Sequence, residues 1–510
     1  MDFPLLTAIT FLPTIGAVVL LLINARAEKG LKVVALLFTT ATFLLSIPVY
    51  LFFDPTTSSF QFEENYAWIP AIGASYHVGI DGISLFMVLL TTFLSPLIIL
   101  SSWTAIHKSV KGFLVSMLLL ETGMLGVFIS LDLLLFYVFW EAMLIPMYFI
   151  IGIWGGERRI YAAVKFFIYT MVGSLLMLVA LIYIYLYVGK QTGTYTFDYL
   201  ILRDYLMPVG LQTWLFLAFG LSFAIKVPVF PFHTWLPDAH VEAPTAGSVV
   251  LAGVLLKMGT YGFLRFCLPL FPNASLQFAE FISILAVIGI LYGAWVAMVQ
   301  ADVKKLVAYS SVSHLGFVML GIFTFTHQGM LGGLIQMVNH GLSTGALFLI
   351  VGMIYERRHT RLISEFGGLA RQIPIFTAFF AVVMLSSLGL PGLNGFVGEF
   401  LILLGAFQKS HTITAFAASG VIFAAVYLLW MFRRTMFGPL TKEENRRLTD
   451  LNMREIAVLV PIVLFIVWIG VYAQPFLGKM ESSVDALIKF VEAKKTAVVE
   501  NGDQMWARGR

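Results

Sequence analysis

The chain has 510 residues, of which 59% are hydrophobic and only 12% are charged. Soluble globular domains carry roughly 25% charged residues, so this composition excludes a soluble enzyme and indicates a membrane protein with many spans. The formal net charge of +4 comes without a basic run suited to nucleic acid, which excludes a nucleic-acid partner. The single cysteine, Cys267, excludes an internal disulfide, a CxxC metal site and a cysteine-ligated iron–sulfur cluster within the chain.

Apolar runs of about 17 to 25 residues recur from one end of the sequence to the other, and each is long enough to cross a bilayer as a helix. We therefore expect an all-α, polytopic membrane protein with about fourteen transmembrane helices. The run 373–410 is too long for one straight helix and predicts one interrupted crossing. The expected spans are 3–23, 31–53, 84–103, 111–130, 132–154, 161–189, 212–231, 245–268, 277–299, 304–323, 328–355, 373–410, 413–437 and 455–475.

The distribution of Lys and Arg predicts the orientation of these helices. With the N-terminus outside, most basic residues fall on inner connections, whereas the outer connections before the C-terminal tail hold only Lys190, Arg203 and Lys409. Because inner loops of membrane proteins are enriched in Lys and Arg, we expect an external N-terminus. The basic tail after residue 475 also falls outside, but most of its charges lie far from the last helix, where the bias weakens.

The central part of the sequence looks duplicated. Residues 1–110 hold the first three helices, 111–268 and 277–437 hold five crossings each, and 438–510 hold an inner loop, the last helix and the tail. An odd number of helices per repeat inverts the second copy relative to the first, as in many transporters. The fourth crossing of each copy is rich in Pro and Gly, which predicts two helices that break near mid-membrane, at 226–231 and 389–399.

Four ionisable residues interrupt the apolar runs: Glu141, Lys226, Lys257 and Glu399. A charge at bilayer depth costs about 2.5 kcal/mol or more, so several of them with alternating sign indicate a path for charge across the membrane. Glu141 lies nine residues past Asp132, where its helix is expected to begin, which places it roughly 13 Å into the bilayer. Both predicted helix breaks lie beside one of these residues, Lys226 and Glu399.

Glu141 and Lys226 could form a switch. Desolvation disfavours the charged form of an amine, and a nearby carboxylate restores it. We therefore expect that making and breaking a Glu141–Lys226 pair changes how tightly the lysine holds its proton.

Other polar residues in the apolar runs allow two readings. His314 and His340 could carry protons between Lys257 and Glu399, since histidine exchanges protons near neutral pH, or each could make one internal hydrogen bond. Glu121 and Lys165 could be further proton carriers or structural partners near an interface. Neither histidine has a carboxylate or Cys at ligand spacing, so we expect no metal site. Arg265, near a helix end, is expected to extend its head group to the membrane surface.

The sequence contains no dinucleotide-binding glycine motif after a strand, no P-loop, and no flavin or haem signature. We therefore expect that the chain itself binds no cofactor. If redox chemistry powers this protein, other chains perform it.

Several stretches resemble one known family. They are HVGIDGIS at 77–84, WEAMLIP at 140–146, KVPVFPFHTWLPDAHVEAP at 226–244, SHLG at 313–316 and GFVGE at 395–399. With these motifs, the chain closely resembles, over nearly its whole length, the subunit M family of bacterial NADH-quinone oxidoreductase, respiratory complex I. Members of that family are antiporter-like, proton-translocating subunits of the membrane arm.

The resemblance implies roles for the buried residues. Glu141 looks like the glutamate of helix five, Lys226 its partner on broken helix seven, Lys257 the central lysine, and Glu399 the terminal residue on broken helix twelve. His314 and His340 look like the polar axis that connects them. It also implies a bacterial inner (plasma) membrane location, with NADH, FMN, iron–sulfur clusters and quinone held by partner subunits. Other complex I membrane subunits, with antiporter-like neighbours on both sides, would be the partners, beside the lipid bilayer and protons.

Two features favour the subunit M pattern over its sister subunits. Position 399 is Glu, where the sisters usually carry Lys. We also expect no long lateral helix like that of subunit L, since only 35 residues follow the last crossing. Two alternatives stay open at this point: a subunit of a multi-subunit sodium/proton antiporter, which shares the fold and most motifs, and a passive scaffold whose buried charges only fix helix packing.

Overall fold

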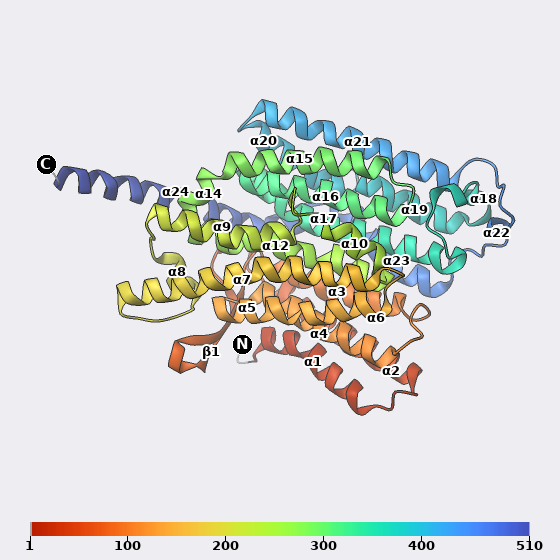
Figure 1. Ribbon diagram of the computed structural model, residues 1–510, viewed down its shortest axis with the longest axis horizontal. Coiled ribbons are helices and arrows are strands. Elements are labelled where there is room, and N and C mark those ends of the chain that lie inside the picture. The colour runs from red at the N-terminus through yellow and green to blue at the C-terminus, as the bar shows by residue number, and fades with distance from the viewer. Residues whose placement is uncertain (1–2, 509–510) are drawn as a thin grey trace.

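Nearly parallel helices make up most of the chain in the computed structural model, which describes residues 3–508 and the side chains up to residue 495 (Figure 1). Twelve helices in this part are long and apolar enough to cross a membrane. They are α1 (Leu5–Leu22), α2 (Glu28–Leu51), α4 (Val110–Ile129), α5 with α6 (Leu133–Trp154), α7 (Arg159–Thr192), α9 (Val209–Lys226), the run Thr245–Leu270, α15 (Ala279–Met298), α16 (Val303–Phe323), α17 (His327–Arg358), α21 (His411–Met436) and α23 (Met453–Val471).

Three shorter apolar helices complete the bundle: α3 (Leu85–Ser101), α19 (Pro374–Ser387) and α20 (Asn394–Phe407). The helices α19 and α20 together occupy the run 373–410, where the sequence predicts one interrupted crossing. The prediction of a polytopic helical membrane protein is thus confirmed.

The centre of the bundle is formed by three elements: α16, α17 and the run Thr245–Leu270, which are almost wholly buried. The peripheral helices α2, α7, α21 and α23 expose much of their apolar surface. In a membrane this exposed surface faces lipid or other subunits, whereas polar side chains on the three central elements are shielded from both. The core therefore sits where the predicted charge path runs.

The run Thr245–Leu270 is not a regular α-helix. It consists of α11 (Thr245–Val250), the π-helical turn η2 (Leu251–Leu255), α12 (Leu256–Gly262), a second π-helical turn η3 (Phe263–Cys267) and α13 (Leu268–Leu270). Such π turns are rare and occur often at functional sites. Lys257 lies directly between them.

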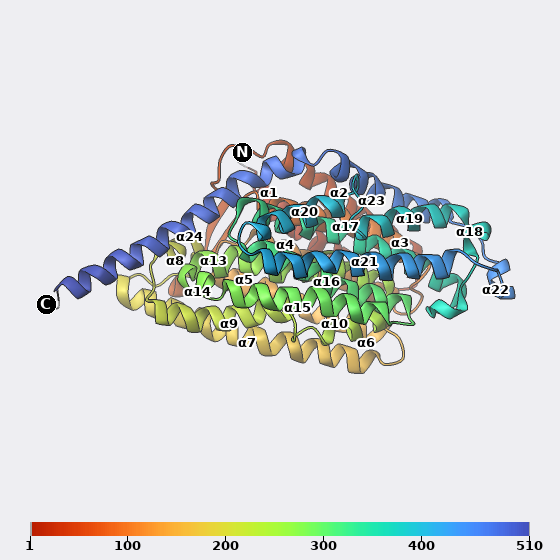
Figure 2. The same ribbon diagram turned by 90° about the horizontal axis from the view of Figure 1, so that it is seen from above.

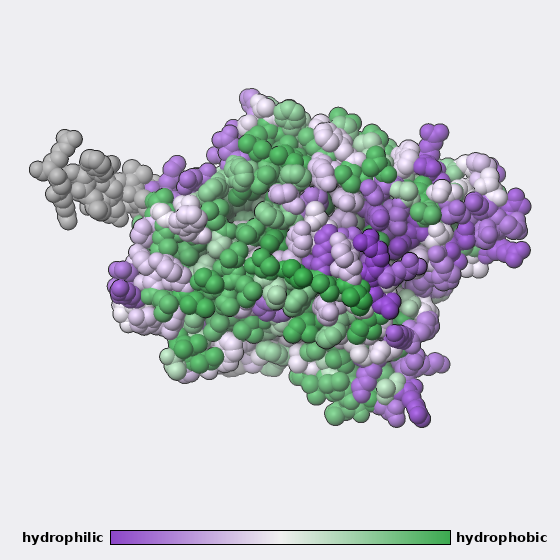
Figure 3. Space-filling model, in the orientation of Figure 1, coloured by the Kyte–Doolittle hydropathy of each residue, from purple (hydrophilic) through white to green (hydrophobic). Residues whose placement is uncertain are grey.

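The two ends of the bundle differ. We call one the hairpin end, because it carries the β-hairpin, α8 (Tyr199–Asp204), α14 (Pro272–Gln277) and the start of α24 (Gln474–Arg508), on the left in Figure 1. The opposite end carries η4 (Ile363–Glu365), α18 (Leu369–Gln372) and α22 (Glu443–Arg446), and Figure 3 shows hydrophilic residues gathered there. The expected inner connections with their basic residues lie at this opposite end, so the hairpin end corresponds to the predicted outer face.

The β-hairpin is a departure from the expected all-α fold. Strand β1 (Gln61–Ile69) pairs antiparallel with β2 (Ala74–Ile80) through the short helical turn η1 (Pro70–Ile72). Gly73 ends the turn with φ of +64°, and a Cβ there would collide with the Tyr195 carbonyl oxygen. This residue must therefore be glycine.

The chain stays helical after the last crossing. The tail forms one 35-residue helix, α24, about 52 Å long, which runs obliquely across the hairpin end (Figure 2). Its side chains contact segments that lie far apart in the sequence. The contacts are Lys479 Nζ to the Phe53 carbonyl at 3.1 Å, the Gly82 amide to Ser483 Oγ at 2.9 Å, and Asp485 Oδ1 to His327 Nδ1 at 2.5 Å.

Candidate functional site

Lys226 is the last residue of α9, because Pro228 and Pro231 cannot continue the helix. The chain becomes helical again only in α10 (Trp235–Glu242), so the predicted break is present. The Lys226 side chain is 1% exposed. Two aromatic rings and a sulfur atom enclose its Nζ. The Nζ atom lies 5.3 Å from the ring centroid of Trp140, 5.6 Å from that of Phe166 and 3.9 Å from the sulfur of Met143.

Glu141 lies near the end of α5 (Leu133–Ala142), and α6 begins at Leu144 (Leu144–Trp154). The sequence predicts a continuous helix here, but the hydrogen-bond ladder is interrupted because Pro146 has no N–H to donate to the Ala142 carbonyl. The Glu141 carboxylate acts electrostatically on Lys226. In the described part of the chain, however, no direct ion pair joins the two side chains. The predicted partners are therefore neighbours, and the direct ion pair between them is not formed in this structure.

Lys257 is fully buried. Its Nζ donates to the Ala252 carbonyl of the preceding π turn and lies 2.6 Å from Nδ1 of His340 on α17. Two residues further on, Gly259 touches the backbone of α9, since a Cβ there would lie 2.8 Å from the Val227 nitrogen. The helices that carry Lys226 and Lys257 therefore pack backbone against backbone.

A continuous line of polar side chains leads from Lys257 into the second half of the sequence. The His340 ring lies 6.0 Å from the ring of His314 on α16, measured between centroids. His314 Nδ1 lies 3.0 Å from Glu399 Oε1 on α20, and Gln336 Nε2 donates to the same oxygen at 3.3 Å. The structure thus brings together Lys257, His340, His314 and Glu399, four of the predicted site residues, which we call the central axis.

A small polar cavity lies beside the central axis, at the break between α19 and α20. The Nε2 atoms of both axis histidines are buried without a hydrogen-bond partner within the described chain. Buried polar groups of this kind are commonly satisfied by ordered water, which can also relay protons. The polar side chains that line the cavity include His314, His340, Asn339, Ser343 and Ser386.

Glu121 and Lys165 lie away from the central axis. Lys165 Nζ pairs with Asp238 of α10 at 2.7 Å, and both side chains are partly exposed. Glu121 on α4 is 1% exposed, and neither carboxylate oxygen has a hydrogen-bond partner among the described residues. Lys165 therefore has the geometry of a structural ion pair, whereas Glu121 has no such explanation.

The structure also contains a buried ion pair that the sequence reading missed. Arg265, expected to reach the membrane surface, is instead 4% exposed and pairs with Asp81 of the HVGIDGIS segment. Its Nε donates to the Tyr261 hydroxyl at 3.1 Å. The signal for this pair was an aspartate in an otherwise apolar segment, but its partner lies 184 residues away.

His240 is a second residue whose position could not be read from the sequence. It is fully buried in α10 and stacks on Phe348 with ring centroids 4.5 Å apart. Its ring nitrogens have no hydrogen-bond partner among the described residues, and Lys257 and Lys304 both act on it electrostatically. No group of three or more His, Cys, Asp or Glu side chains in the described range could hold a metal ion.

Known proteins match this chain over the region that contains the site residues. Residues 130–426, which contain Glu141, Lys226, Lys257 and Glu399, match a family model described as NADH:quinone oxidoreductase/Mrp antiporter, transmembrane region. NADH-quinone oxidoreductase subunit M of Rhodobacter capsulatus is 49% identical over 496 residues, covering 95% of this chain and 96% of the relative. The chain belongs to the subunit M family. Another member, from Rickettsia prowazekii (strain Madrid E), is 46% identical and covers 96% of this chain and 100% of its own length.

Other proteins similar to this subunit M family member include a chain 4 protein and chains of solved structures. NADH-ubiquinone oxidoreductase chain 4 of Chondrus crispus is 46% identical, covering 96% of this chain and 98% of the relative. A chain of respiratory complex I from Thermus thermophilus with bound NADH superposes with a TM-score of 0.87 at 33% identity, covering 95% of this chain and 99% of that one. A chain of the archaeal membrane-bound sulfane sulfur reductase, with a TM-score of 0.79 at 24% identity, shares the fold.

Proposed function

We propose that this chain translocates protons across the inner membrane of a bacterium as an antiporter-like subunit of NADH:quinone oxidoreductase. One observation carries the proposal most directly. The side chains of Lys257, His340, His314 and Glu399 form a line through the buried centre of the bundle, where ionisable groups are otherwise too costly to retain.

Each member of the central axis can pass a proton to the next. A neutral imidazole accepts a proton on one ring nitrogen and releases one from the other, so His340 and His314 can relay a proton between Lys257 and Glu399. The polar cavity beside the two rings has hydroxyl and amide groups that would hold water across the gap between them. The proton then reaches Glu399 at the second helix break.

Lys226 and Glu141 act as the switch at the other end. The Lys226 amine is surrounded by two aromatic faces and a thioether, so the Glu141 carboxylate is the charge that stabilises its protonated form. When that charge approaches, Lys226 holds its proton, and when it withdraws, Lys226 releases the proton toward Lys257. Moving one charge against 100 mV requires about 2.3 kcal/mol, which corresponds to a change of about 1.7 pKa units.

The two helix breaks lie at matching places in the two halves of the chain. We infer that residues 111–268 and 277–437 are inverted repeats, with breaks after Lys226 and before Glu399 at matching places. Glu121 and Lys165 are additional proton-path candidates, the former as an unpartnered buried carboxyl and the latter through its pairing with Asp238.

The redox reaction belongs to partner subunits, which hold the NADH site, FMN, the iron–sulfur clusters and quinone. The partners of this chain are other membrane subunits of complex I, with antiporter-like neighbours on both flanks. Exposed apolar side chains on α1, α7 and α21 offer surfaces for such neighbours and for lipid. A sodium/proton antiporter subunit is not favoured, because relatives at 44–49% identity over nearly the full length are named subunit M.

The test is to tag the chain, extract it in mild detergent and assay the purified assembly for inhibitor-sensitive NADH:quinone reduction. We expect activity together with co-purifying flavin and iron; a redox-silent assembly would contradict the proposal. In the same background, Lys257→Gln should abolish proton pumping with the assembly intact. The matched control is Lys190→Gln, an exposed lysine at the end of α7, which should pump normally. Normal pumping by Lys257→Gln would instead support a passive scaffold.

A further inference from the structure

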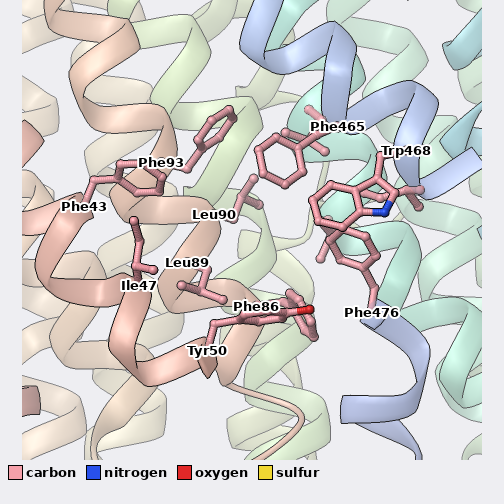
Figure 4. Close-up of a pocket in the computed structure, with 13 residues that line it drawn as sticks. Phe43, Ile47, Tyr50, Phe86, Leu89, Leu90, Phe93, Phe465, Trp468 and Phe476 are labelled. Atoms are coloured by element: carbon pink, nitrogen blue, oxygen red, sulfur yellow. The ribbon is translucent and has the colours of Figure 1, made fainter. Parts of the chain in front are cut away.

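An apolar groove opens on the flank of the bundle between α2, α3, α23 and the first turn of α24 (Figure 4). Its cavity volume is about 250 Å³. Consecutive contacts between aromatic rings form a belt around it. The contacts, with centroid distances, are Tyr50–Phe86 6.1 Å, Phe86–Phe476 5.5 Å, Phe476–Trp468 5.3 Å, Trp468–Phe465 5.7 Å, Phe465–Phe93 4.9 Å and Phe93–Phe43 5.7 Å.

The groove spans about two-thirds of the depth of one bilayer leaflet. It begins at the hairpin end with Phe86, the second residue of α3, and reaches Phe93, about 10 Å further along that helix. Val338 and Leu342 of α17 close its floor near the middle of the bundle. Since the hydrocarbon core of a bilayer is about 30 Å thick, one leaflet is about 15 Å deep. The groove therefore matches an acyl chain that enters from the hairpin end, and its apolar lining suits nothing charged.

The mouth of the groove carries one positive and one negative side chain. Lys479 Nζ lies 4.6 Å from the Tyr50 ring centroid and donates to the Phe53 carbonyl at 3.1 Å. Asp54, which follows directly, is exposed and acts electrostatically on Lys479. This pair complements a head group that carries both a phosphate and an ammonium. An anionic head group would be repelled by Asp54, and an uncharged quinone ring would use neither charge.

We propose that the groove is a binding site for a zwitterionic phospholipid, with an acyl chain inside the aromatic belt, the phosphate beside Lys479 and the ammonium beside Asp54. The bound chain packs against the floor residues Val338 and Leu342. These flank Asn339 and His340 on the same helix, so the lipid supports α17 directly behind the central axis.

The test uses the assembled, purified complex in nanodiscs that contain phosphatidylethanolamine with a photoreactive acyl chain. We expect cross-links concentrated on the α2, α3 and α23 peptides that line the groove. Excess unlabelled phosphatidylethanolamine should compete at least fivefold better than phosphatidylglycerol. Uniform labelling of the bundle surface, equal competition by both lipids, or preferential labelling by a photoreactive isoprenoid quinone would overturn the proposal.

Substitutions separate the groove from the general lipid surface. Ile47→Trp places a large ring inside the groove, and we expect at least a fivefold loss of the groove cross-links. Leu44→Trp is the matched control, because Leu44 lies one turn away on α2 and is 57% exposed. Equal cross-linking in Ile47→Trp and the parent complex would contradict the site. Asp54→Asn should remove the preference for phosphatidylethanolamine over phosphatidylglycerol, and an unchanged preference would contradict the assigned head group.

Discussion

Replacing Lys226 with Arg tests whether this residue must release its proton. The cage around Lys226 consists of Trp140, Phe166 and Met143, and a guanidinium stacks on aromatic faces at least as well as an ammonium. We therefore expect Lys226→Arg to fold and assemble. The substitution keeps the positive charge and changes mainly the tendency to lose a proton.

The size of the effect follows from the two reference pKa values. Lysine in water has a pKa of about 10.4, and arginine is harder to deprotonate by about 3.4 pKa units, or about 4.6 kcal/mol. The same desolvated cage surrounds either side chain. A cycle that works against 100 mV supplies about 2.3 kcal/mol per charge, which is half of the added cost. Deprotonation of the arginine would therefore be suppressed by about three orders of magnitude.

The assay is proton uptake by proteoliposomes that contain the purified complex, followed with a pH-sensitive dye during NADH oxidation. We expect Lys226→Arg to lower proton pumping and coupled NADH:quinone reduction at least tenfold. NADH oxidation by ferricyanide, which needs no quinone, should stay at the parent level and serves as the control for assembly. Full pumping by Lys226→Arg would refute the reasoning, because a fixed positive charge would then be sufficient.

Three further outcomes are expected. Gly259→Ala inserts a Cβ where α12 touches the α9 backbone, so it should lower pumping several-fold while Gly210→Ala, with open space around it, should not. Arg265→Met leaves Asp81 as an unpaired buried charge and should destabilise the subunit by about 3–5 kcal/mol, measured as lost assembly, with partial recovery on adding Asp81→Asn. Burial lowers the pKa of His77, but hydrogen bonds to Asp198 and Glu63 outweigh it and raise that pKa above 6.5. The stabilisation is thus complete below about pH 6.5 and is lost as pH rises through the folded-state pKa. The protection factors of the hairpin amides, which correct for base-catalysed intrinsic exchange, should therefore fall at alkaline pH in the parent but not in His77→Gln.

The sequence predicts the crossings and the buried charges for a simple physical reason. A charged residue in a run of about 20 apolar residues stands out whatever the tertiary structure, and Pro and Gly interrupt a helix through local backbone chemistry. The positions of Lys226 and Glu399 beside helix breaks therefore follow from local sequence alone.

Contacts between distant segments do not follow from local sequence. Lys257 meets His340 across 83 residues, and Arg265 meets Asp81 across 184 residues. Both contacts depend on which helices pack together and in which register, and neither composition nor periodicity specifies that choice. The π turns beside Lys257 escaped prediction because their residues have ordinary helix-forming composition.

The hairpin and the C-terminal helix escaped for a different reason. The segment 61–69, QFEENYAWI, has only weak alternation, and most of β1 is exposed, so no buried face marks it as a strand. Much of α24 is polar, and its stability comes from contacts with segments far away in sequence. A helix stabilised in this way has a weak local signal.

The position of α24 has a consequence for how this protein is made. The buried N–H of Gly82 gains its hydrogen-bond acceptor only after Ser483 has been synthesised, 401 residues later in the chain. At a synthesis rate of about 5–20 residues per second, that interval lasts about 20–80 seconds on the ribosome. During this time the inserted helices stand in the membrane with an unfinished outer surface. The segment that covers this surface, α24, is synthesised after the helices that it contacts, so only a chain translated through α24 presents a completed surface to its neighbours and to quality-control proteases.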